Sequence, residues 1–128
     1  MRPLALPHWP NERWERFTAR TILVLWAAFW IWFGVASALS EGLPTAGIVA
    51  HAALPGLLFA AIALLAWRSE RAAGILLLAI AGMILLAYDS MMGQNGLLFV
   101  LEVGSILAGP PALAGLLFLM AYHHDQRR

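Results

Sequence analysis

Four long apolar stretches, separated by connections of only a few residues, constrain the fold of this chain most strongly. Each is close to the ~20 residues that an α-helix needs to cross about 30 Å of hydrocarbon. Helices are the only secondary structure that fits, because an open sheet edge in lipid would leave backbone groups without partners. The stretches run from about Thr21 to Leu39, Ala46 to Trp67, Ala72 to Tyr88 and Leu97 to Tyr122.

The composition indicates the same class. Hydrophobic residues make up 62% of the 128 residues and charged residues only 12%, which is more apolar surface than one small soluble core can bury. The short connections leave no room for a soluble domain. We therefore expect an all-α fold, an integral membrane four-helix bundle over residues 21–122, preceded by a segment 1–20 and followed by a tail 123–128.

The charges are segregated along the chain. The arginines lie before the first apolar stretch, between the second and the third, and after the fourth, which is one side of a four-span protein. By the positive-inside rule, that side is cytoplasmic. The two other connections carry the acids Glu41 and Asp89. Both termini are therefore predicted to be cytoplasmic, in a multi-pass protein of the cytoplasmic (inner) membrane. The basic residues are all arginines: Arg2, Arg13, Arg16, Arg20, Arg68, Arg71, Arg127 and Arg128.

The segment before the first stretch has an amphipathic pattern. Helical spacing puts its aromatic side chains on one side and its arginines on another, as in a helix that lies at a membrane interface. We expect a short interfacial helix there and membrane lipids as partners, with specific recognition of anionic lipids as the sharper alternative. The expected interface anchors are Trp14, Arg13, Arg16, Arg20 and Trp67.

The first stretch also contains Ala36-Ser37-Ala38, a pattern that resembles the cleavage site of a secretory signal peptide. Cleavage there would leave three spans. Because the stretch is long for a signal core and rich in Trp and Phe, we expect it to be retained.

Ionisable residues inside a span are functional candidates by default. His51 lies about five residues into the second stretch and Glu102 about five residues into the fourth, so both are roughly 7 Å below the outer surface. Asp89 closes the third stretch on the same side. Ser105 shares a helical face with Glu102, and we expect this face to turn inward. The pattern predicts a hydrogen bond or ion pair between His51 and Glu102.

Three readings of these polar residues remain open. They could form interhelical hydrogen bonds that only fix the helix register. They could form a proton or cation site in a low-dielectric setting. The third reading is a divalent metal site, but no ligand spacing in the sequence matches a known motif, and we expect no metal and no other cofactor.

Three prolines interrupt the helical stretches. Pro110 and Pro111 remove the amide donors for two carbonyls one turn earlier, which predicts a kink or break in the fourth stretch. Pro55 predicts a bend in the second. Transporters use broken helices to hold ions, whereas a simple packing kink fits a long helix into the bilayer.

Short motifs are distributed over most of residues 19–120. They are Ala19-Arg20, Trp26, Trp30, Phe33-Gly34, His51, Leu54-Pro55, Ala66-Trp67-Arg68, Gly74, Pro111 and Gly115-Leu116-Leu117-Phe118. In these motifs the sequence resembles a prokaryotic family of short four-span membrane proteins that is defined by a domain of unknown function. The resemblance implies a four-helix integral membrane protein and no assigned activity. Glu102 does not match the family pattern.

No nucleophile with an adjacent base is visible, and the chain contains no cysteine, so we do not expect an enzyme. A lipid-modifying enzyme would depend on the lone His51. The expected function is an accessory or structural subunit of the membrane, as a homo-oligomer or within a larger membrane complex, with no nucleic acid as partner. The alternative is an oligomeric proton- or cation-linked small transporter that uses His51 and Glu102.

Overall fold

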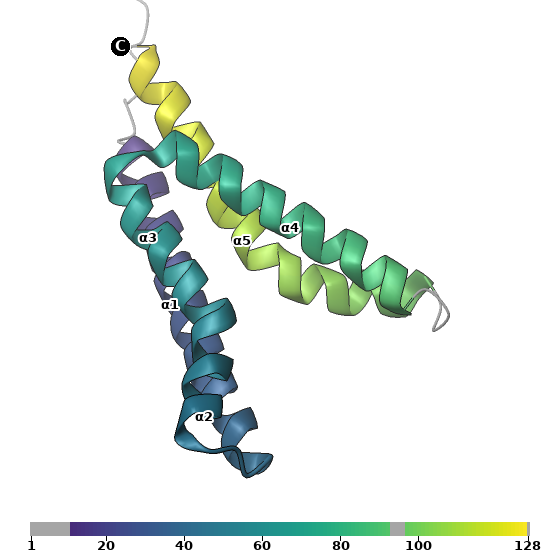
Figure 1. Cartoon of the computed structure of the whole chain (residues 1–128). Helices are drawn as coiled ribbons and strands as arrows, with labels where there is room; N and C mark the ends of the chain where they lie inside the picture. The colour runs from purple at the N-terminus through teal and green to yellow at the C-terminus, as the bar shows by residue number, and fades with distance from the viewer. Residues whose placement is uncertain (1–10, 93–96, 128) are drawn as a thin grey trace, which may run out of the picture.

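A computed structural model describes residues 11–92 and 97–127 (Figure 1). Within these ranges the chain is almost entirely helical and contains no strand, so the predicted all-α class is confirmed. The elements are α1 (Asn11–Ser40), α2 (Thr45–Ala52), a π-helical turn η1 (Ala53–Leu57), α3 (Leu58–Arg68), α4 (Glu70–Met92) and α5 (Leu97–Gln126).

The helices form two hairpins that diverge from a common end. α1 lies against α2, η1 and α3, whereas α4 lies against α5 (Figure 1). The hairpins meet where α1 begins, where α3 turns into α4 and where α5 ends, and they separate toward their other ends. We call the shared end the vertex, each hairpin an arm, and each free end a tip. The described helices therefore form two diverging arms, and the predicted four-helix bundle is not shown.

The hydrophobic core explains why the arms meet only at the vertex. Its residues come from all the longer helices, and small side chains on α1, α3, α4 and α5 let bulkier ones fit between the backbones. Leu77 and Phe118 are completely buried there. The core consists of Ala19, Leu23, Ala27, Phe59, Ile62, Ala66, Ala73, Leu77, Ala114 and Phe118.

Three helices of the described chain are long and apolar enough to cross a membrane. They are Arg13–Ser40, Glu70–Ala87 and Leu101–Gln126. Thr45–His51 and Leu54–Arg68 meet at 42° and add a fourth span if the two form one bent segment. The apolar character of these helices is compatible with a membrane protein.

The expected interfacial helix is not a separate element. α1 runs without interruption from Asn11 to Ser40, because neither proline nor glycine occurs in it before Gly34. It ends where Gly42 adopts a φ of 66°, with the amide of Leu43 bonded to the carbonyl of Ala38 at 3.0 Å. This is the usual way in which a glycine terminates a helix.

The prolines have different effects on their helices. Pro55 lies inside η1, where the chain bends between α2 and α3. A π-helical turn contains one residue more than an α-helical turn, and the bend occurs at this irregular turn. Pro110 and Pro111 lie inside α5, which continues through them without a break and curves along its length in Figure 1. The possibility of a broken fourth helix is therefore excluded by this structure.

Ser69 separates α3 from α4 with an extended backbone conformation. Its hydroxyl accepts a hydrogen bond from the amide of Ala72 at 3.3 Å, which satisfies one of the free donors at the start of α4. Glu70 follows at the first helical position, where the helix dipole favours a negative charge. The chain thereby reverses direction at the vertex in a single residue.

Candidate functional site

The predicted pairing of His51 with Glu102 is wrong. His51 belongs to the tip of the first arm, where its Nε2 lies 3.9 Å from Glu41 Oε2 and its Nδ1 lies 3.3 Å from the carbonyl oxygen of Gly47. Glu102 lies on α5, toward the tip of the other arm, and its side chain is exposed. The sequence placed both residues at the same depth, but equal depth does not make two residues neighbours when the arms diverge (Figure 1).

The face of α5 that carries Glu102 and Ser105 does not turn inward. Both residues are exposed, whereas Gly104, Ala108 and Pro111 are buried. A Cβ added at Gly104 would lie 3.0 Å from Leu85 Cδ2 of α4, so the small side of α5 is the side that packs. Asp89 belongs to α4, but its side chain lies outside the part of the chain that the structure describes.

Ion pairs at the vertex join helices that are distant in the sequence. Arg16 Nε of α1 donates a hydrogen bond to Glu70 Oε2 of α4 at 2.9 Å. Arg20 Nη2 lies 3.5 Å from Glu70 Oε1, and Arg16 Nη2 lies 3.4 Å from Asp125 Oδ2 of α5. Because the Glu70 side chain is only 15% exposed, water screens this pair less than a surface pair.

A second contact at the vertex links the beginning of α1 to the end of α5. His124 Nδ1 lies 3.1 Å from Glu15 Oε2, and the Glu15 side chain is 12% exposed. Nearby, the Arg71 guanidinium lies 5.8 Å from the centre of the Tyr122 ring, within the range of a cation–π interaction. These contacts and the ion pairs of Arg16 together form the vertex cluster.

Sequence reasoning missed the vertex cluster because it assigned the arginines to lipid alone. Arg16 and Arg20 are partly buried and contact a carboxylate of the protein. The sequence feature that could have revealed the cluster is Glu70, an acid in the connection between the second and third apolar stretches, which otherwise carries arginines. The other expected anchors are exposed: Trp14 by 68%, Trp67 by 62%, and Arg13 as well.

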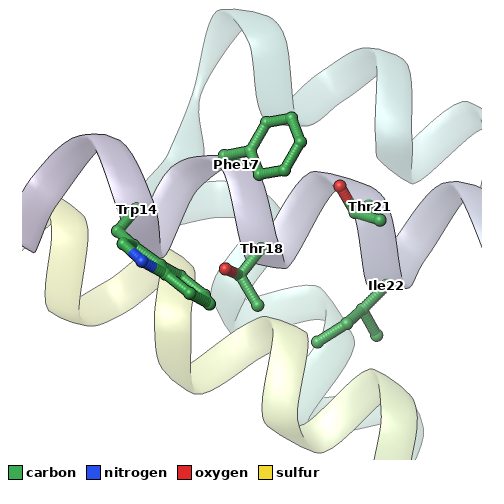
Figure 2. Close-up of a pocket in the computed structure, with 5 residues that line it drawn as sticks. All are labelled: Trp14, Phe17, Thr18, Thr21 and Ile22. Atoms are coloured by element: carbon green, nitrogen blue, oxygen red, sulfur yellow. The ribbon is translucent and has the colours of Figure 1, made fainter.

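An apolar groove runs along the exposed side of α1 near the vertex. It encloses about 510 Å³ and is lined by Trp14, Phe17, Thr18, Thr21 and Ile22. Figure 2 shows these five side chains projecting from consecutive turns of α1. The aromatic members are strongly exposed, as aromatic residues at a membrane interface are.

A cavity lies between the two arms. It has a volume of about 370 Å³, and we call it the arm crevice. Both arms contribute apolar side chains to its walls. They are Trp30, Pro55, Leu58 and Phe59 from the first arm and Ile80, Ile84, Ala87 and Leu107 from the second.

A smaller cavity of about 220 Å³, the tip pocket, lies within the first arm. It shares Trp30 and Pro55 with the arm crevice but also includes the polar residues Ser37 and His51. The indole nitrogens of Trp26 and Trp30 are buried and have no hydrogen-bond partner within the described ranges. The remaining walls of the tip pocket are Phe33, Gly34 and Leu54.

Among the residues whose side chains are described, no three His, Asp or Glu groups lie close enough together to hold a metal ion. Glu70 neutralises part of the arginine charge at the vertex. At the tip, Glu41 Oε2 lies 3.9 Å from His51 Nε2, and Glu41 Oε1 accepts a hydrogen bond from the Ser37 hydroxyl at 3.5 Å.

The fold and the site define a class: an all-α protein with apolar helices that are compatible with a membrane, held at one end by ion pairs. The chain belongs to the family described as domain of unknown function DUF7670, whose model matches residues 10–128. This match confirms the resemblance to a domain-of-unknown-function family. No curated protein and no solved structure matches the chain.

Proposed function

We propose that this chain is an integral membrane protein of the cytoplasmic membrane with four spans and both termini in the cytoplasm. Three apolar helices and one bent pair of helices supply the spans. The arginines at the ends of these helices lie at the vertex, whereas Glu41 lies at a tip. The positive-inside rule then directs the vertex to the cytoplasm.

We further propose that the protein acts as an accessory or structural subunit. The observation that carries this proposal is the divergence of the two arms, which leaves an apolar crevice open between them. Apolar surface that one chain leaves uncovered is typical of proteins that act through contact with other components. The ion pairs at the vertex hold helices together.

The transporter alternative is not supported by any observation of the structure. It requires His51 and Glu102 to act together, and they lie on different arms. The two residues therefore do not share a site within one chain.

Topology is tested with single cysteines, for which this cysteine-free chain is suited. Ser40→Cys places an exposed thiol at a tip, and Gln126→Cys places one at the vertex. With a membrane-impermeant maleimide, the first variant should react in intact cells and the second only after lysis. Labelling of both variants in intact cells, or of neither before lysis, would overturn the proposed topology.

The subunit role is tested by native mass spectrometry of the tagged wild-type protein, extracted together with its surrounding lipid. A stoichiometric foreign membrane protein supports an accessory subunit. A species that contains only this chain, at every extraction condition that preserves known membrane complexes, contradicts that role.

A further inference from the structure

We propose that the tip pocket and the arm crevice form one binding site for a zwitterionic glycerophospholipid with a primary amine in its head group. The head would occupy the tip pocket and one acyl chain the arm crevice. This inference rests on the proposed membrane location and goes beyond it, because it assigns a specific ligand class to one site.

The two cavities are adjacent and share wall residues. Trp30 and Pro55 line both. The tip pocket has polar residues at one end, Ser37 and His51, whereas the arm crevice is lined only by apolar side chains. A polar end that continues into an apolar cavity complements an amphipathic molecule with a head and a chain.

The charges at the tip favour a zwitterionic head. Glu41 supplies a carboxylate and His51 an imidazole, with 3.9 Å between Glu41 Oε2 and His51 Nε2 and side chains 53% and 45% exposed. At this distance they are too far apart for a good hydrogen bond to each other. Glu41 Oε1 accepts a hydrogen bond from the Ser37 hydroxyl at 3.5 Å, a long contact that a ligand can replace. An ammonium group pairs with the carboxylate, and a phosphate accepts from the imidazole and from the Ser37 hydroxyl. An anionic head without an amine would place its charge beside Glu41.

Trp30 lines both cavities and carries an indole N–H. Its indole N–H is buried and lacks an acceptor among the described residues, which costs free energy unless an acceptor is present. In a glycerophospholipid the ester carbonyls lie between the head and the acyl chains. Such a carbonyl is an acceptor of the kind that Trp30 lacks.

The arm crevice fits an acyl chain. Ile80, Ile84 and Leu107 face Leu58 and Phe59 across its volume of about 370 Å³. Filling this space with hydrocarbon restores dispersion contacts that an open cavity loses. A bound chain thereby adds contacts between the two arms beyond those of the core, to which Phe59 belongs.

The wild-type protein provides the first test. The protein is purified in detergent, equilibrated with equal amounts of phosphatidylethanolamine, phosphatidylcholine and phosphatidylglycerol with identical acyl chains, and analysed by native mass spectrometry. We expect one lipid per chain to resist collisional removal, with the ethanolamine lipid favoured by about fivefold, the factor that one exposed ion pair contributes. Equal retention of all three lipids, or complete loss of all three, overturns the proposal.

Variants then separate the head from the chain. Glu41→Gln should abolish the preference for ethanolamine, and Glu102→Gln, an exposed carboxylate on the other arm, should leave it unchanged. An unchanged preference in Glu41→Gln overturns the assignment of the head. This test does not depend on a change of packing, so it remains decisive if a crevice variant fails to fold.

For the chain, Ala87→Trp places a large side chain in the arm crevice, and Leu86→Trp is the matched control, because Leu86 is 73% exposed and does not line the crevice. We expect Ala87→Trp to lose the retained lipid and Leu86→Trp to keep it. Retention by both overturns the proposed position of the chain. Since cysteine labelling reports topology independently, a correctly inserted protein without a retained lipid would contradict this inference and leave the proposed function intact.

Discussion

Gly56 allows two backbones to approach each other inside the first arm. A Cβ at this position would lie 2.9 Å from the backbone nitrogen of Ile31 and 3.1 Å from its Cα. A side chain can rotate away from a new methyl group, but a helix backbone cannot do so without moving the whole element. The position of η1 against α1 therefore depends on the absence of a side chain at one residue.

We expect Gly56→Ala to destabilise the protein by about 1–3 kcal/mol, the usual cost of overpacking. Thermal unfolding in detergent, followed by tryptophan fluorescence, measures the effect. Gly82→Ala is the control, because a Cβ at Gly82 meets nothing within 4 Å. If the two variants melted at the same temperature, the close approach of η1 to α1 would be refuted.

Close glycine contacts, the hydrophobic core and ion pairs join the helices to one another. α4 and α5 cross at paired glycines, since a Cβ at Gly115 would lie 3.0 Å from the carbonyl oxygen of Gly74. The first arm is joined to the second by the core at the vertex and by Glu70, which pairs with Arg16 and Arg20 of α1. Glu70 thus connects the start of α4 to a helix 50 or more residues earlier in the chain.

Glu70→Gln should reduce stability by about 1–2 kcal/mol. The neutral amide removes a charge-assisted hydrogen bond, leaves the partly buried Arg20 guanidinium without this carboxylate, and leaves Arg16 with Asp125 as its carboxylate partner. The measurement is the melting temperature in detergent at low salt, where screening is weak. Glu102→Gln replaces an exposed carboxylate and should not change it, so a drop of equal size in both variants would show that general charge, and not this pair, is responsible.

The whole molecule has the shape of two arms joined at the vertex. Glu15 and His124 meet at the vertex with 3.1 Å between Oε2 and Nδ1, whereas His51 and Glu102 belong to separate arms that diverge toward their tips (Figure 1). The arrangement follows from a core that all the longer helices share at one end only.

Pairs of cysteines distinguish this shape from a closed bundle. With a short bifunctional maleimide, Glu15→Cys combined with His124→Cys should crosslink within one chain, and His51→Cys combined with Glu102→Cys should not. Gel mobility of the denatured monomer reads out the crosslink. Efficient intramolecular crosslinking of the second pair would contradict the diverging arms and restore the pairing that the sequence suggested.

The all-α class, the approximate extent of the apolar helices and the grouping of the arginines could be predicted from the amino-acid sequence. These properties are local, because hydropathy, helix length and charge are read from consecutive residues. The family resemblance could be anticipated for the same reason, because the residues that carry it are short runs along the chain, and the family match covers residues 10–128. The continuity of α1 was harder to predict from sequence. Its amphipathic beginning and its apolar remainder differ in composition but share one helical backbone conformation.

Which helix faces meet, and which polar residues become neighbours, depends on the tertiary packing of the helices. Hydrophobicity cannot select a packing face on a helix that is apolar all round, so side-chain size selects it. Gly104 packs against α4 while Glu102, two residues earlier, remains exposed. Glu70 pairs with Arg16 of α1, and His51 lies beside Glu41 of its own arm. These contacts depend on how the two arms diverge. No single stretch of sequence specifies the angle between the arms.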